Sequence, residues 1–188
     1  AGAFTSTLQT GAGHAILRAG ASTAVITFGP FGGFHGHFDK LSFVYFNQGK
    51  ELAYDPGRAR SQAYRLPVHR NWYRATTSHN TVLVDRVSQE GVEGQCELFL
   101  ATPELSAVAA HTDTAYTNVL HRRLLVLRPG FLIGADVLTA SDGKRHTFDW
   151  LYHNRGESVS SSVATQEAAP PQGQGFEYLQ DVRRGKTD

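Results

Sequence analysis

The sequence of 188 residues lacks several features that would narrow its class quickly. Its one cysteine, Cys96, leaves no partner for an intrachain disulfide, so cysteine content does not indicate a redox compartment. No apolar run approaches the roughly 18 residues that a membrane-spanning helix needs, and the N-terminus lacks the order of a signal peptide. The formal net charge is only +1, from 18 basic and 17 acidic residues. We therefore expect neither a membrane nor a nucleic-acid partner.

Helical periodicity is also weak, and runs rich in Val, Ile, Phe, Tyr and Leu alternate with Gly, Pro and Asn. This pattern predicts an all-β fold, an antiparallel β-sandwich. Two turn signals, Asn47-Gln48-Gly49-Lys50 and Pro129-Gly130, predict hairpins, the first with a tight register. The expected strands are residues 23–28, 41–46, 51–54, 81–85, 96–101, 105–111, 124–127, 131–138 and 176–182.

The domain organisation is read from length and composition. We interpret residues 1–188 as one β-sandwich domain and leave truncation at both ends open. Residues 157–175, where the composition shifts to Ser, Gln, Ala and Pro, are predicted to be a mobile excursion.

A motif of two imidazoles and a carboxylate, His35-Gly-His37-Phe-Asp39, is the most informative stretch. In a strand these three side chains would share a face, where they would serve as metal ligands or proton-transfer groups. Asp55 follows a strand-like run and His79 opens another, so both lie at element edges where ligands converge. His37, Asp55 and His79 with a water would form a zinc site, and satisfied structural polar residues are the alternative.

Between residues 55 and 77 the strand pattern gives way to a loop dense in Arg, Tyr and His. Long loops of this composition are often functional, and we expect this one to face a ligand through Arg58, Arg60 and Arg74. Tyr64 is a candidate acid or base because neighbouring cations would lower its pKa. An exposed loop tyrosine without a role is the alternative.

Two other metal-binding motifs begin with the same histidines, but this sequence departs from both of them further along. The metallo-β-lactamase motif continues with a histidine where this chain has Lys40. Cupins place a glutamate three or four residues after the second histidine, where this chain offers Leu41 and Ser42.

Three segments taken together, Phe28 to Phe43, Asp55-Pro-Gly57 and Arg74 to Asp85, resemble the heparinase II/III-like family of polysaccharide lyases, which includes alginate lyases. The likeness runs from about Ala15 to Asn154. It implies the C-terminal β-sandwich of a protein whose N-terminal (α/α) toroid is missing from this chain. It also implies that His37, Asp55 and His79 hold a mainly structural zinc, and that His35 lines the catalytic cleft.

The resemblance implies a reaction as well: β-elimination in a uronic-acid-containing glycan, with alginate preferred. The carboxylate is neutralised, the C5 proton is removed and the 4-linked sugar leaves. In some alginate lyases of this family the catalytic tyrosine directly precedes a Leu-Pro pair. Here Arg65 precedes Leu66-Pro67, and Tyr64 lies one residue earlier. We expect an acidic polysaccharide and the helical domain as partners, a periplasmic or secreted location, and little activity in the isolated fragment.

Two other functions stay open. One is a non-catalytic β-sandwich that binds metal and an acidic glycan, and the other is a metal hydrolase with an activated water.

Overall fold

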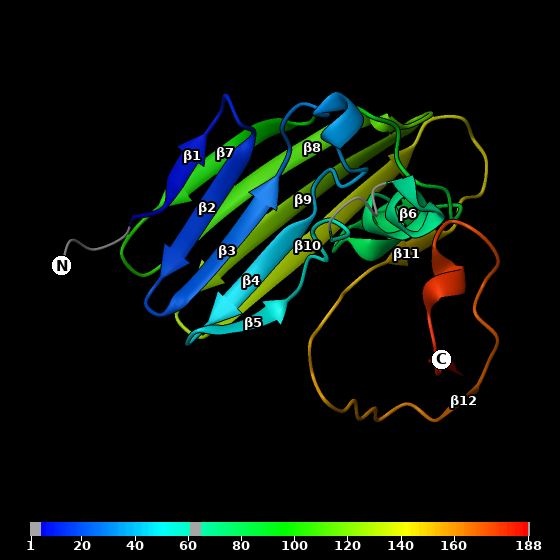
Figure 1. The fold of residues 1–188 in the computed structure, drawn as a ribbon. Helices are drawn as coiled ribbons and strands as arrows, with labels where there is room; N and C mark the ends of the chain where they lie inside the picture. Colours follow the sequence, from blue (N-terminus) through cyan, green and yellow to red (C-terminus); the bar gives the residue numbers. More distant parts are fainter. Residues whose placement is uncertain (1–4, 61–64, 188) are drawn as a thin grey trace.

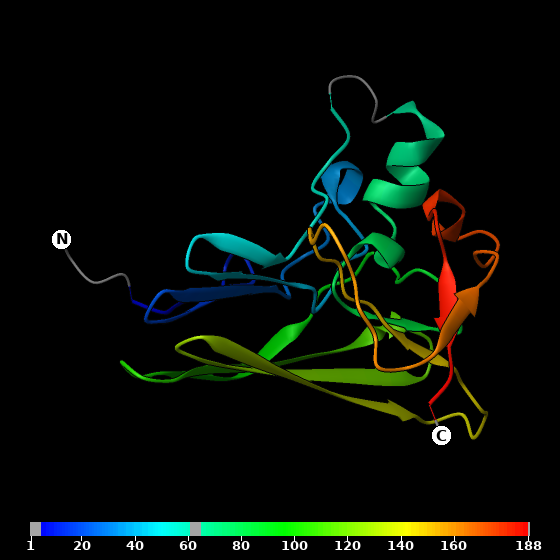
Figure 2. The ribbon, with the colours of Figure 1, turned by 90° about the horizontal axis from the view of Figure 1, so that it is seen from below.

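The central feature of the computed structural model, which describes residues 5–60 and 65–187, is a pair of antiparallel sheets packed face to face (Figure 1, Figure 2). The five-stranded sheet has the order β1-β2-β3-β4-β5 and the four-stranded sheet the order β10-β9-β8-β7. The predicted all-β antiparallel sandwich is confirmed. The strands of the first sheet are β1 (Thr7–Gln9), β2 (His14–Ala19), β3 (Ser22–Thr27), β4 (Phe43–Asn47) and β5 (Lys50–Ala53). Those of the second are β7 (Gln95–Ala101), β8 (Ser106–Tyr116), β9 (Val119–Arg128) and β10 (Phe131–Ala140).

The core lies between the sheets and follows from alternation along the strands. In β2 the buried Ala15 and Leu17 alternate with less buried residues, and in β9 Leu125 and Leu127 do the same. All four side chains are inaccessible to solvent and belong to one cluster. Each buried leucine contributes roughly 1.5–3 kcal/mol of hydrophobic free energy. Burial of these faces therefore stabilises the packing of one sheet on the other.

Both predicted hairpins are present. Arg128 pairs directly with Phe131, which leaves Pro129 and Gly130 as a two-residue turn. Gly130 has a φ of 90°, a value that glycine adopts without strain. The β4–β5 hairpin also forms, but its expected tight register is wrong, because the pairing shifts between Tyr45 and Phe46.

A second group of short elements gathers at one end of the sandwich (Figure 1, Figure 2). There β6 pairs with β11, and turns of helix surround this small ribbon. None of the described helices has the length and apolar content to cross a bilayer. The elements of this end are η1 (Gly33–His35), η3 (His69–Tyr73, a π-helix), η4 (Thr76–Ser78), β6 (Val82–Val84), β11 (Phe148–Trp150), β12 (Thr165–Glu167), η5 (Phe176–Tyr178) and β13 (Arg183–Gly185).

The C-terminal part differs from the prediction. The strand expected at residues 176–182 is wrong: η5 occupies its first half and the strand β13 comes later. The reason is Gly175, whose φ of 91° turns the chain into a short 3-10 helix. Inside the region 157–175, Thr165–Glu167 pairs with β13. The mobility of this region stays a prediction.

Candidate metal centre and basic cavity

The motif with His35, His37 and Asp39 is a loop and not the strand that alternation suggested, because η1 ends at His35 and no ladder follows it. The loop is held against the η3–η4 region. Phe38 donates its N–H to the carbonyl of Arg74 at 3.0 Å, and the Arg74 guanidinium donates to the carbonyl of Gly36 at 2.8 Å. These bonds fix the backbone on both sides of His37, whose ring contacts those of His69 and His79.

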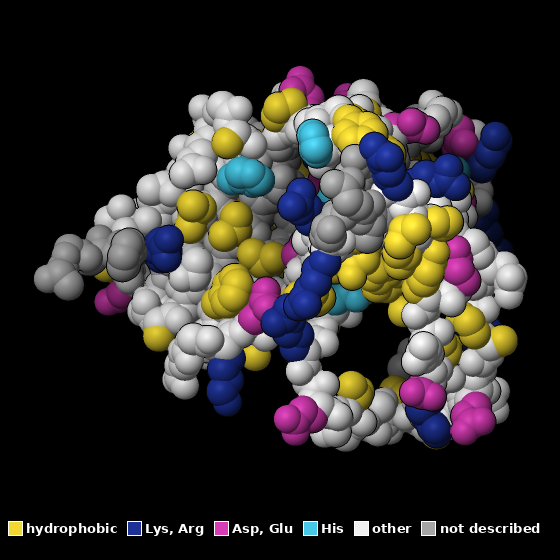
Figure 3. Space-filling view, in the orientation of Figure 1, with side chains coloured by type: hydrophobic (Ala, Val, Ile, Leu, Met, Phe, Trp, Pro, Cys, Tyr) yellow, Lys and Arg dark blue, Asp and Glu magenta, His cyan; other side chains and the backbone are white. Residues whose placement is uncertain are grey.

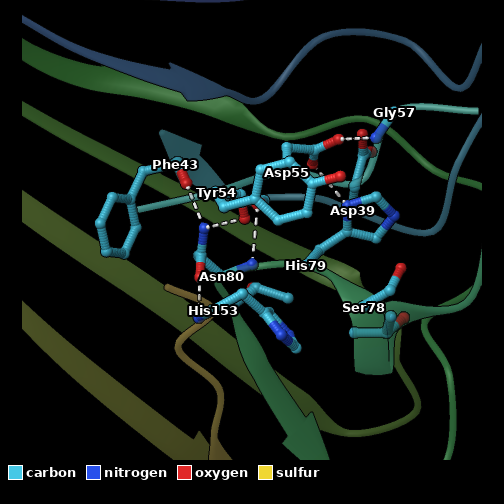
Figure 4. A network of polar contacts seen from close by, with 12 residues as sticks. Asp39, Phe43, Tyr54, Asp55, Gly57, Ser78, His79, Asn80 and His153 are labelled. Carbon is cyan, nitrogen blue, oxygen red and sulfur yellow. Dashed lines mark hydrogen bonds and ion pairs between the residues drawn. The ribbon is translucent and has the colours of Figure 1, made fainter. Parts of the chain in front are cut away.

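His79 and Asp55 form the centre of the site (Figure 4). Nδ1 of His79 lies 2.7 Å from Oδ2 of Asp55, and Oδ1 of Asp55 accepts the N–H of Gly57 at 2.8 Å. An ionised carboxylate only accepts, so Nδ1 carries the hydrogen and Nε2 keeps its lone pair. That Nε2 is buried without a hydrogen-bond partner among the described residues.

Asn80 locks the backbone next to His79 (Figure 4). Its amide nitrogen donates to the carbonyls of Phe43 and Tyr54 at 2.8 and 2.9 Å, and its side-chain oxygen accepts the N–H of His153 at 2.7 Å. Asn80 is fully buried and its hydrogen bonds reach three separate segments. Such a satisfied buried network has one low-energy geometry, which fixes His79 in place.

Three side chains offer convergent ligand atoms. One atom each from His37, Asp39 and His79 lie within 4.8 Å of one another, and the rings of His37 and His79 are 5.3 Å apart. Asp39 completes this group, whereas Asp55, the predicted ligand, lies against Nδ1 of His79 and is not part of it. The choice of Asp55 as ligand stays a prediction. Asp39 was grouped with His37 by sequence but was left out of the predicted ligand set.

The protonation states suit a cation. Burial lowers the pKa of His37 to about 4, so this imidazole is neutral at pH 7. Burial alone would raise the pKa of Asp55, but the hydrogen bonds from His79 and from the N–H of Gly57 outweigh it and the net pKa is lowered. Neutral imidazoles with ionised carboxylates are the donors that Zn²⁺ takes, so the residues present fit this ion.

Beside this cluster lies a cavity of about 840 Å³ with a basic lining. Among the described lining residues are four arginines and three histidines, and no carboxylate. The predicted ligand-facing residues His35, Arg58 and Arg74 are among them, but Arg60 is not. The full described lining is Phe34, His35, His37, Arg58, Arg65, Leu66, Pro67, His69, Arg70 and Arg74.

The sequence reading missed part of this cavity. His69, Arg65 and Arg70 lie in the same loop, and its richness in Arg and His was the available signal. Tyr64, the predicted acid or base, lies outside the described residues. Figure 3 shows Lys and Arg side chains following one another down the middle of one face, beside a cluster of hydrophobic side chains.

The end of the sandwich therefore carries a cluster of His and Asp side chains beside a basic cavity. The family model described as heparinase II/III-like, C-terminal, matches residues 6–184. The chain therefore belongs to the heparinase II/III-like C-terminal family.

The sequence relatives include polysaccharide lyases. The chain is 30% identical over 151 residues to an alginate lyase of Stenotrophomonas maltophilia (strain K279a), covering 70% of this chain and 20% of that protein. It is 28% identical over 152 residues to an exo-oligoalginate lyase of Saccharophagus degradans (strain 2-40), covering 71% of this chain and 21% of that protein. The chain thus spans about a fifth of the length of these curated relatives.

Solved structures share the fold. A heparinase III gene product superposes with a TM-score of 0.75 at 22% identity, covering 89% of this chain and 27% of that one. A mutant of the heparan sulfate lyase HepC from Pedobacter heparinus gives a TM-score of 0.66 at 24% identity, covering 74% of this chain and 23% of that one. At these identities the likeness concerns the fold alone.

Proposed function

We propose that this chain is the zinc-bearing β-sandwich part of a polysaccharide lyase that cleaves a uronic-acid-containing glycan, with alginate preferred, by β-elimination. The observation that carries the proposal is the cavity in which His35 and four arginines meet beside the His37 and His79 cluster. The two sequence relatives named as alginate lyases favour alginate.

The charge of the cavity suits the first requirement of the reaction. A uronate carboxylate opposes removal of the neighbouring C5 proton until its own charge is neutralised. Arg58 and Arg74 both line the cavity, so their guanidinium groups can hold such a carboxylate by paired hydrogen bonds. His35 lies within the same lining and is the described group suited to moving a proton.

The proposed zinc has a structural role. His37, His79 and a carboxylate from Asp55 or Asp39 would hold it, and its charge would replace the missing partner of the buried Nε2 of His79. The ion would tie the loop of residues 35–39 to the η4–β6 junction. The loop supplies His35 and His37 to the cavity lining, so the ion would hold this side of the cavity in place.

The larger assembly and the location belong to the proposal too. The remaining length of the relatives leaves room for a helical domain that completes the cleft, and a periplasmic or secreted location suits an enzyme acting on polysaccharide.

The experiment is an assay of the native-length gene product on alginate, heparan sulfate and hyaluronan, with detection of the unsaturated uronate by ultraviolet absorbance. We expect product from alginate first and little from the isolated chain. Replacing His35 by Ala and Tyr64 by Phe should each abolish turnover while leaving glycan binding in place. Absence of an unsaturated product from every acidic glycan would refute the lyase, and retained binding without turnover in the unmodified protein would favour the non-catalytic module.

A further inference from the structure

Two half-exposed aromatic side chains lie next to each other outside the basic cavity. Trp150, at the end of β11, is 51% exposed, and Tyr152, two residues later, is 46% exposed. Their ring centroids are 6.0 Å apart and their planes differ by only 14°. These two nearly parallel, stacked rings form an exposed aromatic pair, which we call the platform (Trp150 and Tyr152).

The rings of the platform are anchored by their polar atoms. The indole N–H of Trp150 donates to Oδ2 of Asp136 at 2.8 Å, and the Tyr152 hydroxyl donates to the carbonyl of Leu52 at 2.5 Å. Asp136 is itself held by the buried Arg123. Both polar edges are therefore satisfied by the protein, and the ring orientation is fixed before any ligand arrives. Pre-ordering of this kind lowers the entropic cost of binding, because the two side chains need not be ordered when a ligand arrives.

The platform and a basic residue, Arg155, contact the same strand, β5, because Tyr152 bonds to Leu52 and Arg155 pairs with the adjacent Glu51. Tyr54, the neighbour of Asp55, donates its N–H to the carbonyl of His153 at 2.9 Å. The guanidinium of Arg155 lies 4.0 Å from the centroid of the Tyr54 ring and is within 3.5 Å of Glu51. The Arg155 side chain is 61% exposed, so it can still meet an anion. Figure 3 shows basic side chains running between the end of β5 and the segment after β11.

We infer that Trp150 and Tyr152 form a remote subsite that stacks on the pyranose ring of an acidic glycan, with Arg155 receiving a carboxylate of the same chain. The inference rests on the proposed function for the identity of the glycan. Sugar rings present a face of C–H groups, which packs on the exposed face of an aromatic ring. A basic group beside the platform selects uronates over neutral sugars.

The test uses the indole N–H signals of the 188-residue chain in a two-dimensional ¹⁵N NMR spectrum. The chain has two tryptophans, and Trp72→Phe assigns the remaining signal to Trp150. Mannuronate oligosaccharides should shift the Trp150 signal saturably, and cello-oligosaccharides of the same length should bind more weakly. Binding followed by calorimetry should weaken about tenfold in Trp150→Ala, the loss of one stacking contact. Trp150→Phe should recover part of the affinity because it keeps an aromatic face.

Phe148→Ala is the matched control, because Phe148 lies on the same strand and is 45% exposed but its ring contacts His146. This variant should bind as the unmodified chain does. Arg155→Gln should lower the preference for uronates without lowering the affinity for neutral sugars.

Three results would overturn the subsite. The first is oligouronate binding that Trp150→Ala does not weaken, a result that leaves the lyase proposal intact. The second is a Trp150 signal that no oligouronate moves. The third is a Trp150 signal that moves with protein concentration alone, which would assign the platform to contact between copies. The lyase proposal fails separately, on the absence of an unsaturated product from the native-length protein.

Discussion

Arg123 and Asp136 face each other across β9 and β10 as a buried, two-point ion pair. Nε of Arg123 lies 2.8 Å from Oδ1 of Asp136, and its Nη2 lies 2.9 Å from Oδ2. The remaining nitrogen, Nη1, donates to the carbonyls of Leu41 and Asn80 at 2.7 and 2.6 Å. The pair therefore connects the four-stranded sheet to the residue next to His79 and to the loop that carries His37.

Removing one member of this pair is expected to destabilise the fold strongly. Asp136→Asn leaves the Arg123 charge buried without a counter-ion, since Arg123 is only 1% exposed. Breaking buried pairs of this kind costs about 3–5 kcal/mol. The measurement is urea unfolding of the variant and the unmodified chain, followed by circular dichroism.

The matched control is Arg122→Ala on the same strand. Arg122 pairs with Glu97 at 3.1 Å, but 49% of its side chain is exposed. Exposed pairs contribute about 0–1 kcal/mol, so this variant should unfold almost where the unmodified chain does. Equal losses in the two variants would contradict the special position of Arg123.

The free energy of unfolding should decrease as the pH is lowered, because of two groups in the same region. Burial lowers the pKa of His121, although its hydrogen bond to Asp136 opposes the shift. Burial would raise the pKa of Asp136, but the hydrogen bonds from His121 and Arg123 hold it far below its usual value. In both cases the folded state binds fewer protons than the unfolded chain. Stability is therefore lost as pH falls, below about 6.5 for His121 and below about 3.9 for Asp136.

The measurement is the unfolding free energy at several pH values between 7 and 4. A protonated His121 would bury an N–H without an acceptor, because its Nδ1 has no partner among the described residues. His121→Gln keeps a donor toward Asp136 but has no such titration, so its stability should fall less steeply between pH 7 and 5. An equal slope in both proteins would exclude His121 as a source of the pH dependence.

Sequence patterns predicted the sheets well because burial on one face of a strand leaves a period of two in the chain. Ala15 and Leu17 show that period, and Pro129-Gly130 marks its turn locally. The loop of His35 to Asp39 carries the same apparent alternation, but its shape is set by bonds that join Gly36 and Phe38 to Arg74, more than thirty residues away. Local patterns do not contain such contacts, so the motif was identified while its conformation was not.

The platform was missed for a related reason. Trp150 and Tyr152 lie outside every strand that the sequence predicted, and their anchoring partners, Asp136 and Leu52, come from distant strands. The Arg-rich loop was easier to interpret, since its composition alone indicates an anionic ligand.

A close backbone crossing before the histidine loop provides another prediction. Gly13 has a φ of 65°, and a Cβ placed there would lie 1.8 Å from the Cα of Gly29. Gly13→Ala therefore forces the two segments apart and adds left-handed strain, which together should cost about 2 kcal/mol or more. Thermal unfolding should show a clear loss. Gly11→Ala, where a Cβ meets nothing within 4 Å, should leave the unfolding temperature nearly unchanged, and similar losses in both variants would contradict the crossing as the cause.

The two carboxylates beside His79 lead to a prediction that separates the possible donor sets. Chain purified without added metal should contain zinc close to one per molecule by elemental analysis. Asp55→Asn should weaken zinc binding by more than about 100-fold if Asp55 is a ligand, whereas loss of a group that only orients His79 costs about 10–100-fold.

The variant Asp39→Asn, measured in parallel, tests the other carboxylate. The control is Asp113→Asn, a change at an exposed residue of β8, which should bind zinc normally. Competition with a chelator of known affinity gives the numbers. In the double variant Asp55→Asn/Asp39→Asn only the two imidazoles remain, and two imidazoles alone leave a zinc site incomplete. Unchanged zinc binding in this double variant would show that the ion is held somewhere else.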